Sequence, residues 1–352
     1  MSLLNRNRGL GERWRNSLWL LLGLLLSGAL LFAANWEADR RGQLQMNIFR
    51  GEVTTLVRIT ETAIDEKFHD FDNILLSLRS AYVTHPKFFP EYLRLLRKGP
   101  LSDPSILVVL VDSDGYLALT DATDKKSHTY LGDRKYFRYF ADGGKDDFYI
   151  DEPIQSRITK RHTLPVVRPI YDKQGSFLGV VALSVPQESL AKLWPKQHLS
   201  DNMTINIINH GGALLSRSQD FTEARGTKIQ PDLLTPMHKG VEGVFTHRTR
   251  SDEGERVIAF QQIRLGVTPL IVYADSSPEQ VLSDISRVRT LLMLSAGTIS
   301  VIIMTLIAVY LKKQKISLRL IDTLRRSREQ EYEILTQTPL VNRHAKMTHL
   351  RG

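Results

Sequence analysis

The stretch FYIDEPIQSRITKRHTLPVVRPIYDKQGSFLGVVALSV, residues 148–185, contains two long apolar runs with a turn between them. The runs TLPVVRPIYD and SFLGVVALSV are rich in β-branched and aromatic residues, and Asp172 and Gly175 lie in the turn. Apolar runs on both sides of a glycine-containing turn predict a β-hairpin. FYIDEPIQ predicts a further strand, so this stretch indicates an antiparallel sheet.

Two features upstream extend this sheet. SILVVLVDSDGYLALT, residues 105–120, is an apolar run, an Asp-Ser-Asp-Gly turn and an alternating run, which predicts another hairpin. DRKYFRYFADGG, residues 133–144, predicts a short helix that ends at Gly143 and Gly144. Five strands with a helical segment between the second and third are typical of a PAS-like sheet.

A weaker copy of the pattern follows. MTINIINHGGALLSRS is again strand, turn and strand, and GVFTHRT, RVIAFQQI and TPLIVYAD predict three more strands. An internal repeat of about 90–100 residues indicates two modules of the same kind. The fold class expected is therefore α+β.

A long amphipathic helix precedes the first module, from Trp36 to about Tyr82. Its apolar residues recur at steps of three and four, as on one face of an α-helix. They are Val53, Leu56, Val57, Ala63, Ile64, Phe68, Phe71, Ile74, Leu75 and Leu78.

Two segments carry no charge, for 21 residues between Arg15 and Glu37 and for 22 residues between Arg289 and Lys312. A helix of that length spans roughly 30 Å, the thickness of a bilayer core, which predicts transmembrane helices at 17–35 and 290–311. Buried core helices are the alternative, and a cleaved signal peptide is an alternative for the first. We expect an uncleaved anchor, because its 18 apolar residues are long for a signal and LLFAANWEAD lacks a clean small-residue cleavage site.

The net charge of +9 belongs to the two ends of the chain. Residues 1–15 carry +3 and residues 312–352 carry +6, so residues 16–311 sum to zero. Positive charge beside membrane spans marks cytoplasmic segments. We therefore expect two passes through the membrane, both termini in the cytoplasm and residues 36–289 outside it. The basic composition then gives no reason to expect a nucleic-acid partner.

A membrane span, a long helix, two PAS-like modules and a second span together resemble the double Cache (dCache) sensory domain of bacterial chemoreceptors, histidine kinases and diguanylate cyclases. The resemblance covers about 36–289 and both spans, and DRKYFRYF with residues 148–185 is its most specific part. It implies a protein of the bacterial inner membrane that forms homodimers, as the apolar stripe of the long helix permits. The implied divisions are a cytoplasmic N-terminus 1–16, helix 36–82, a membrane-distal first module 95–195, a membrane-proximal second module 200–276 and a cytoplasmic tail 312–352.

In this family the first module normally holds the small-molecule ligand, and DRKYFRYF would line the pocket. Planar arginines bind small anions through paired hydrogen bonds, and aromatic rings enclose them. The alternative for each residue is a place in the core or in an ion pair with Asp133, Asp151 or Glu152. The resemblance implies ligand-binding roles for Tyr130, Arg134, Tyr136, Phe137, Tyr139, Arg157, Arg168 and Ser184.

One departure bears on the ligand. Amino-acid-binding members have an Asp late in the last strand for the ammonium group, whereas GVVALSV places Ser184 there. An ammonium group without a carboxylate partner binds poorly in a desolvated pocket. We therefore expect a carboxylate or other small anion that lacks an α-amine.

The sequence contains none of the motifs HExxH, P-loop, GxSxG and CxxC, which mark catalytic, cofactor or metal sites. Its ten His residues are scattered. We expect no enzyme activity in this chain. The 41 residues after the second span contain no GGDEF, EAL or phosphoacceptor motif. Two explanations stay open: a sensor kinase or diguanylate cyclase cut short, which we favour, or a stand-alone sensor with a cytoplasmic signalling partner. The rival to both is a non-catalytic membrane protein that binds a partner protein or glycan outside the cytoplasm.

Overall fold

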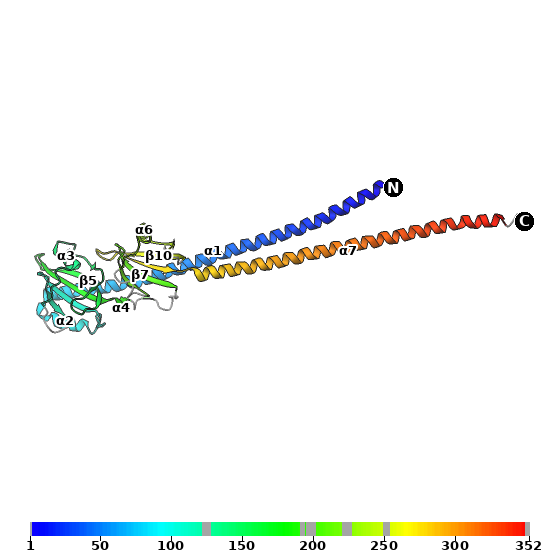
Figure 1. Ribbon diagram of the computed structural model, residues 1–352. Helices are drawn as coiled ribbons and strands as arrows, with labels where there is room; N and C mark the ends of the chain where they lie inside the picture. The colour runs from blue at the N-terminus through cyan, green and yellow to red at the C-terminus, as the bar shows by residue number, and fades with distance from the viewer. Residues whose placement is uncertain are drawn as a thin grey trace. The chain divides into compact units, whose positions relative to one another are not determined.

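The computed structural model describes residues 2–121, 128–190, 194, 202–219, 227–248 and 254–348. The chain divides into two compact units. The folded unit comprises residues 45–281, and the helical pair comprises residues 1–44 with residues 282–352. Figure 1 shows the sheets of the folded unit and the long helices α1 (Ser2–Thr84) and α7 (Glu279–Thr348).

The first module of the folded unit contains one antiparallel sheet with the strand order β2-β1-β6-β5-β3, and β4 also pairs with β5. Its strands are β1 (Leu107–Asp112), β2 (Leu117–Thr120), β3 (Tyr149–Ile150), β4 (Ile154–Gln155), β5 (His162–Tyr171) and β6 (Phe177–Pro186). The two hairpins predicted from the apolar runs are therefore confirmed, and in this sheet they lie side by side through β1 and β6.

The second module repeats this layout with the strand order β8-β7-β11-β10-β9. Its strands are β7 (Met203–Asn209), β8 (Leu214–Arg217), β9 (Glu242–Arg248), β10 (Glu255–Ile263) and β11 (Leu270–Ser276). Both sheets place the first hairpin beside the last strand, so the internal repeat predicted from the sequence is confirmed as an α+β fold with two antiparallel sheets.

FYIDEPIQ is not one strand, as the sequence predicts, but two short ones. β3 pairs with Val166 and Val167, and β4 pairs with His162 and Thr163 of the same neighbour β5. Pro153 lies between them and has no N–H group to donate to a ladder, which interrupts the pairing. Four short helices were also not predicted: η1 (Pro86–Phe88), α2 (Phe89–Leu96), α4 (Gln187–Leu190) and α6 (Pro231–His238).

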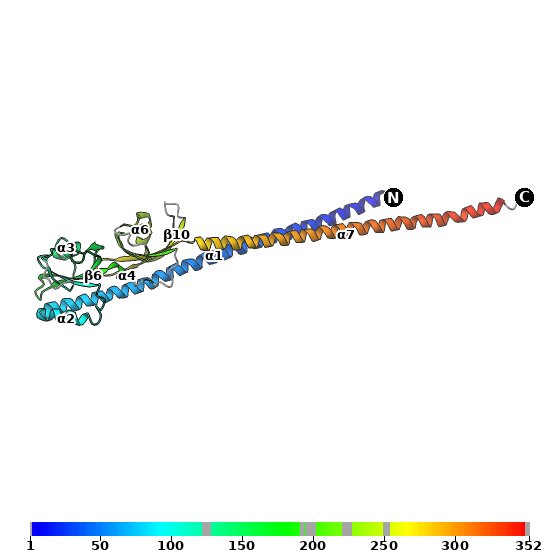
Figure 2. The ribbon, with the colours of Figure 1, turned by 60° about the horizontal axis from the view of Figure 1, so that its bottom comes forward.

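The long helix α1 supplies the main core of the folded unit. Of the ten apolar positions predicted from its periodicity, nine are buried, and Ala63 is half-buried. They form one cluster with inward side chains of both sheets, such as Val166 of β5 and Val272 of β11. Figure 2 shows α1 running along both modules. The apolar stripe thus packs within its own chain, and a homodimer through it stays a prediction.

The two modules also contact each other directly. The backbone N–H of Val267 donates to the carbonyl of Phe148 at 3.0 Å, and the Nδ2 of Asn209 donates to Glu152 at 3.4 Å. Gly266 has a φ of +53°, and a Cβ at that position would lie 2.0 Å from the Phe148 oxygen. Only glycine fits this approach, so the segment after α3 is held closely against the second module.

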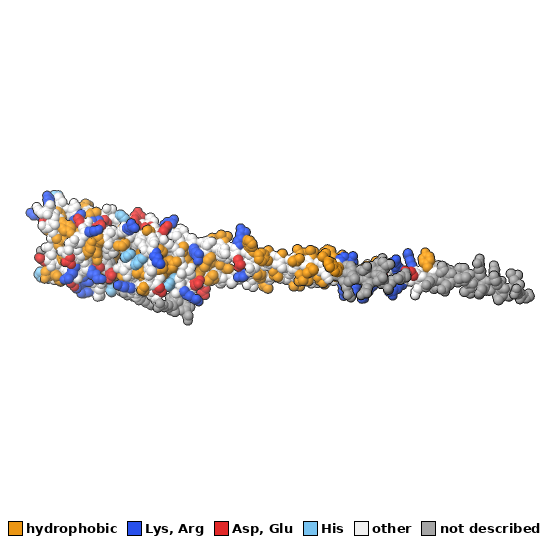
Figure 3. All heavy atoms as spheres, turned by 90° about the horizontal axis from the view of Figure 1, so that it is seen from above, with side chains coloured by type: hydrophobic (Ala, Val, Ile, Leu, Met, Phe, Trp, Pro, Cys, Tyr) orange, Lys and Arg blue, Asp and Glu red, His pale blue; other side chains and the backbone are white. Residues whose placement is uncertain are grey.

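In the helical pair, residues before Leu44 pack against α7. A Cβ on Gly23 would lie 2.5 Å from Cδ1 of Ile307, so the small residue permits the close approach. Arg289 donates to Asn35 Oδ1 at 2.8 Å. Both helices are long and apolar enough to cross a membrane, and most of their apolar side chains face outward. Figure 3 shows these hydrophobic side chains along the helices, with Lys and Arg at the end of the apolar stretch.

Candidate ligand-binding site

The short helix α3 (Lys135–Ala141) covers the face of the first sheet that is turned away from α1. Tyr136 and Phe137 pack there on Val109, Val167 and Ala182. The helix ends at Gly143, whose φ of +88° lets Gly143 and Gly144 donate to the carbonyls of the last turn. The predicted helix and its glycine stop are confirmed.

A small, partly open cavity of about 30 Å³ lies between the start of α3 and this sheet face. That volume holds one or two water molecules. A larger ligand therefore requires the side chains at the rim to move. The polar side chains that line the cavity are Arg134, Tyr136, Ser156, Arg157, Thr163 and Ser184.

Arg134 is the residue whose bonding is incomplete. Its Nη2 donates to the carbonyl of Gln155 at 3.1 Å, but its Nε is buried and has no hydrogen-bond partner among the described residues. A buried donor without a partner costs about 1–3 kcal/mol, and more on a charged group. An anion in the cavity would accept this hydrogen bond and offset the charge.

The other cation of the cavity is already neutralised. Both Nη atoms of Arg157 donate to the carboxylate of Asp133 at 2.6 Å, and Nη1 also donates to the carbonyl of Tyr130 at 2.7 Å. This hydrogen-bonded guanidinium lowers the pKa of Asp133 below its usual value, although partial burial opposes it. Arg134 is therefore the cation of the cavity that has no acidic partner among the described residues.

Neutral hydroxyl groups also line the cavity. Ser184 of β6 donates to Thr163 Oγ1 of β5 at 2.9 Å, and both side chains are buried. Burial raises the pKa of Tyr136, so its hydroxyl keeps its proton at neutral pH and acts as a donor. A guanidinium with hydroxyl donors suits an acceptor-only ligand such as a carboxylate.

Asp151 lies beside the start of α3. Its carboxylate accepts the N–H of Glu152 at 2.8 Å, and the N–H of Tyr136 also bonds to it. The side chain is only 4% exposed, and this burial raises the pKa of Asp151 in spite of both hydrogen bonds. The Tyr136 N–H, in the first turn of α3, thus has a hydrogen-bond acceptor.

The structure thus places Arg134, Tyr136, Arg157 and Ser184, out of eight predicted residues, around one cavity. The other four do not line it. The Tyr130 ring packs on Tyr116 with centroids 5.2 Å apart, Phe137 lies in the core against Phe177, and the Tyr139 ring is tilted against Tyr149 with centroids 5.1 Å apart. Whether any of these eight residues contacts a ligand stays a prediction.

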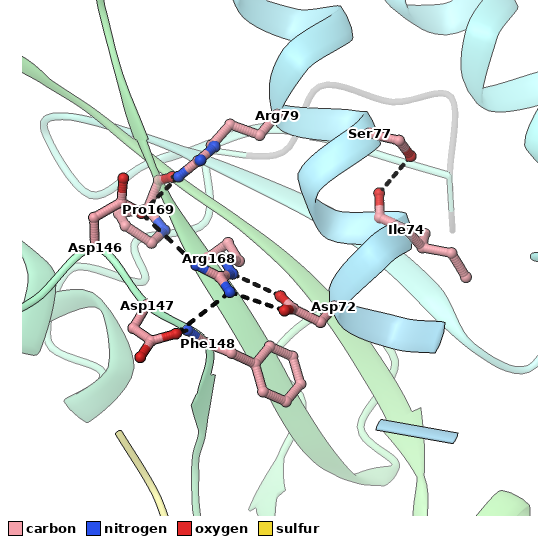
Figure 4. Close-up of polar contacts among 9 residues, drawn as sticks. All are labelled: Asp72, Ile74, Ser77, Arg79, Asp146, Asp147, Phe148, Arg168 and Pro169. Atoms are coloured by element: carbon pink, nitrogen blue, oxygen red, sulfur yellow. Dashed lines mark hydrogen bonds and ion pairs between the residues drawn. The ribbon is translucent and has the colours of Figure 1, made fainter. Parts of the chain in front are cut away.

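Arg168 lies on the other face of the sheet, where it binds α1. Its Nε and Nη2 donate to the carboxylate of Asp72 at 2.6 and 2.8 Å, and Nη2 lies 3.3 Å from Asp147. Figure 4 shows this cluster, with Arg79 donating to Asp146 and to the carbonyl of Pro169. The cluster joins β5, α1 and the segment after α3.

Sequence reasoning missed Thr163 and Pro165, which line the cavity from β5. Alternation in a strand puts residues 163, 165 and 167 on one face and Arg168 on the other. Because Pro165 pairs with Ser184, the cavity side of β5 carries the odd-numbered residues. Arg168 and Ser184, both predicted to bind the ligand, therefore lie on opposite faces of the sheet, and only the register of β5 with β6 shows this.

A larger hollow of about 670 Å³ is an open groove at the end of α1. It is lined by Ser77, Ser80, Ala81, Thr84, His85, Phe88 and Tyr92. The groove has no Lys, Arg, Asp or Glu in its lining and opens widely to solvent. It lacks the unpartnered cation that distinguishes the cavity beneath α3.

Comparison with protein-family models finds no match, and comparison with curated proteins finds none either. Solved structures do match. The extracellular domain of rpHK1S-Z16, described as a histidine kinase, is 23% identical with a TM-score of 0.59, over 68% of this chain and 98% of that one. The ligand-binding domain of the Pseudomonas fluorescens chemoreceptor CtaA, solved with L-serine, is 12% identical with a TM-score of 0.53, over 66% and 99%.

A third match is the ligand-binding domain of the Pseudomonas aeruginosa chemoreceptor PctB, solved with L-Arg. It is 14% identical with a TM-score of 0.50, over 64% of this chain and 94% of that one. Identities this low establish similarity of fold alone. The chain has the dCache-type fold of the extracellular sensor domains of histidine kinases and chemoreceptors.

Proposed function

We propose that this chain is a membrane-anchored sensor that binds a small carboxylate outside the cytoplasm and signals across the membrane without catalysis. One observation carries the proposal: the buried Nε of Arg134 has no partner among the described residues and borders a polar cavity. The dCache-type fold supports a ligand site in the first module. The two apolar helices support the anchoring.

The ligand is an anion without an ammonium group. Ser184 and Thr163 are neutral, with Ser184 donating to Thr163, and no carboxylate lines the cavity among the described residues. The nearby Asp133 is already paired with Arg157. An ammonium group would find no ionic partner and would remain desolvated.

A series of contacts supports the transmission step. Lys135 of α3 binds Glu152 at 3.0 Å, and Glu152 accepts from Asn209 of the second module at 3.4 Å. Phe148 accepts from Val267 of the same module. A ligand that shifts α3 therefore changes contacts with the second module directly. It biases the signalling equilibrium only by the difference between its affinities for the two states.

Isothermal titration calorimetry on the full chain in lipid nanodiscs tests the site, with acetate, pyruvate, succinate and L-serine as probes. Arg134→Lys keeps the charge but loses the planar fork, and we expect it to weaken carboxylate binding by about tenfold or more. The matched control is Arg138→Lys, an exposed position one turn along α3. Equal affinities of Arg134→Lys and the wild type would overturn the proposal.

The groove at the end of α1 favours a second candidate, a protein that binds a partner or a glycan. Phe88 is 65% exposed beside the groove-lining Tyr92 and His85, and Leu95 of α2 is equally exposed. Exposed aromatic side chains at the edge of a groove are common in interaction sites. Pull-down with Phe88→Ser as the control variant tests it: a partner lost with this variant, together with no carboxylate binding, would favour this candidate.

A further inference from the structure

The second module has its own covered sheet face, equivalent to the one beneath α3. One face of its sheet packs on α1 through residues such as Ile207 and Val272. The other face packs on α6, where Met237 lies against Ile208 and Ile258. In both modules a short helix therefore covers the face that is turned away from α1.

Three neighbouring strands carry a row of polar side chains on this α6 face. Arg217 of β8 pairs with Asn206 of β7, and Asn206 pairs with Tyr273 of β11. Residues directly opposite on neighbouring strands point to the same face and lie next to each other. The row continues into Phe260, which makes its far end apolar.

The side chains of this row make no hydrogen bond among the described residues. The Nε of Arg217 is buried without a hydrogen-bond partner among the described residues. Asn206 and Tyr273 are 3% and 5% exposed, and their polar atoms, unlike the Arg217 Nε, keep some contact with solvent. Burying the Arg217 Nε without a partner costs about 1–3 kcal/mol. A ligand atom that accepts a hydrogen bond from this Nε would remove that cost.

The charge of the row is positive. Asp275, two residues along β11 from Tyr273, forms an ion pair with Arg256 of β10, so these two charges cancel. Arg217 has no acidic partner among the described residues. Burial raises the pKa of Tyr273, so its hydroxyl remains a neutral donor. The row offers a guanidinium, an amide and a hydroxyl, a set that suits an anion with several acceptor oxygens.

We infer that Arg217, Asn206 and Tyr273 form a second anion-binding site, in the second module, for a small carboxylate. The guanidinium of Arg217 would hold the carboxylate through Nε, and the Tyr273 hydroxyl and Asn206 amide would donate to the same ligand. This site is separate from the one proposed beneath α3. The two buried, unpartnered arginine Nε atoms within the described residues belong to Arg134 and Arg217, one in each module.

Calorimetry with acetate, succinate and inorganic phosphate tests the site on the full chain in nanodiscs. Arg134→Lys provides the background in which the first site is weakened. Adding Arg217→Lys or Tyr273→Phe should weaken the remaining carboxylate binding by about tenfold. Arg264→Lys, at an exposed position of the same module, is the matched control. Thermal melting of each variant establishes that it is folded.

Hydrogen exchange gives a second readout. Succinate should slow amide exchange in β7, β8 and β11 of the Arg134→Lys variant, and Arg217→Lys should abolish that protection. Unchanged affinity and protection in Arg217→Lys would overturn the inference, and binding of phosphate but not of carboxylates would overturn the ligand class. If Arg217→Lys alone removes all binding, the second site stands and the proposed site at Arg134 fails.

Discussion

The guanidinium of Arg168 forms a two-pronged hydrogen bond to the carboxylate of Asp72, at 2.6 Å from Nε and 2.8 Å from Nη2. This contact joins β5 of the first sheet to α1. The Arg168 side chain is 12% exposed, so the pair is shielded from water. Asp147 lies 3.3 Å from the same guanidinium, which connects the segment after α3 to the pair.

We expect the Arg168–Asp72 pair to stabilise the folded unit by about 2 kcal/mol, because both partners are charged and partly buried. Urea unfolding of the full chain in detergent, with Arg168→Lys, Asp72→Asn and both together, measures the coupling energy. The exposed pair of Arg157 and Asp133 is the matched control. Its coupling energy should stay below about 1 kcal/mol, and similar coupling for both pairs would contradict the prediction.

The buried carboxyl of Asp151 should make stability fall as pH rises. Burial raises its pKa above the unfolded value, so the folded state holds the proton more tightly. The stability that the protonated Asp151 contributes is then fully present below the unfolded pKa of about 3.9. It is lost as pH rises through the raised folded pKa. Asp151→Asn, a neutral mimic, should melt at a higher temperature than the wild type at pH 7. The difference should shrink toward pH 4.

Asp133 serves as the control for this pH dependence, because Arg157 lowers its pKa. The sign is reversed: its contribution is present above the unfolded pKa and is lost as pH falls through the lowered folded pKa. Asp133→Asn should therefore not raise the melting temperature at pH 7. If both variants shift it in the same direction, the assignment to Asp151 is wrong.

Gly266 should be essential to the contact between the two modules. In Gly266→Ala the new Cβ would meet the Phe148 oxygen at 2.0 Å, and φ is +53°. We expect a loss of about 2–3 kcal/mol and faster amide exchange at Val267. Gly175→Ala is the matched control, since φ is +86° and nothing lies within 4 Å of its Cβ. That variant should lose only the conformational cost of about 1–2 kcal/mol.

The sequence predicts the strands and the core well, because both follow from local patterns. Apolar runs around Gly-containing turns mark the hairpins, and the spacing of Phe68, Phe71 and Leu75 marks the buried face of α1. The interruption of the strand at Pro153 is also predictable, because proline has no N–H group to donate to a neighbouring strand. Helices α2 and α6 are short, and their stability comes from packing that no local pattern reveals.

The site was predictable only in part. Tyr136, Phe137 and Tyr139 are near neighbours on one helical turn, and only the packing of α3 on the sheet decides that Tyr136 alone borders the cavity. The row of Arg217, Asn206 and Tyr273 depends on the pairing of the β7–β8 hairpin with β11, about 60 residues further along the chain. Strand register across a sheet is not encoded in any one segment, so this row could not be predicted.

Tyr136 should contribute to binding through its hydroxyl and to stability through its ring. Tyr136→Phe removes a single oxygen from a side chain that is 4% exposed and lines the cavity. We expect stability to change by less than about 1 kcal/mol and carboxylate affinity to fall about five- to tenfold, the value of one hydrogen bond. Phe137→Leu should instead lower stability and leave carboxylate affinity unchanged, since Phe137 packs in the core. Equal affinity of Tyr136→Phe and the wild type would remove Tyr136 from the site.

The proposed two-pass topology predicts which positions are accessible from each side of the membrane. The chain contains no cysteine, so single cysteines can be introduced without background. In intact bacterial cells an impermeant maleimide should label Thr159→Cys, in the folded unit, and should leave Ser327→Cys, beyond the second apolar segment, unlabelled until the membrane is permeabilised. Both positions carry small polar residues in the sequence. Labelling of Ser327→Cys in intact cells would contradict a cytoplasmic C-terminal segment, and protection of Thr159→Cys would contradict a ligand site outside the cytoplasm.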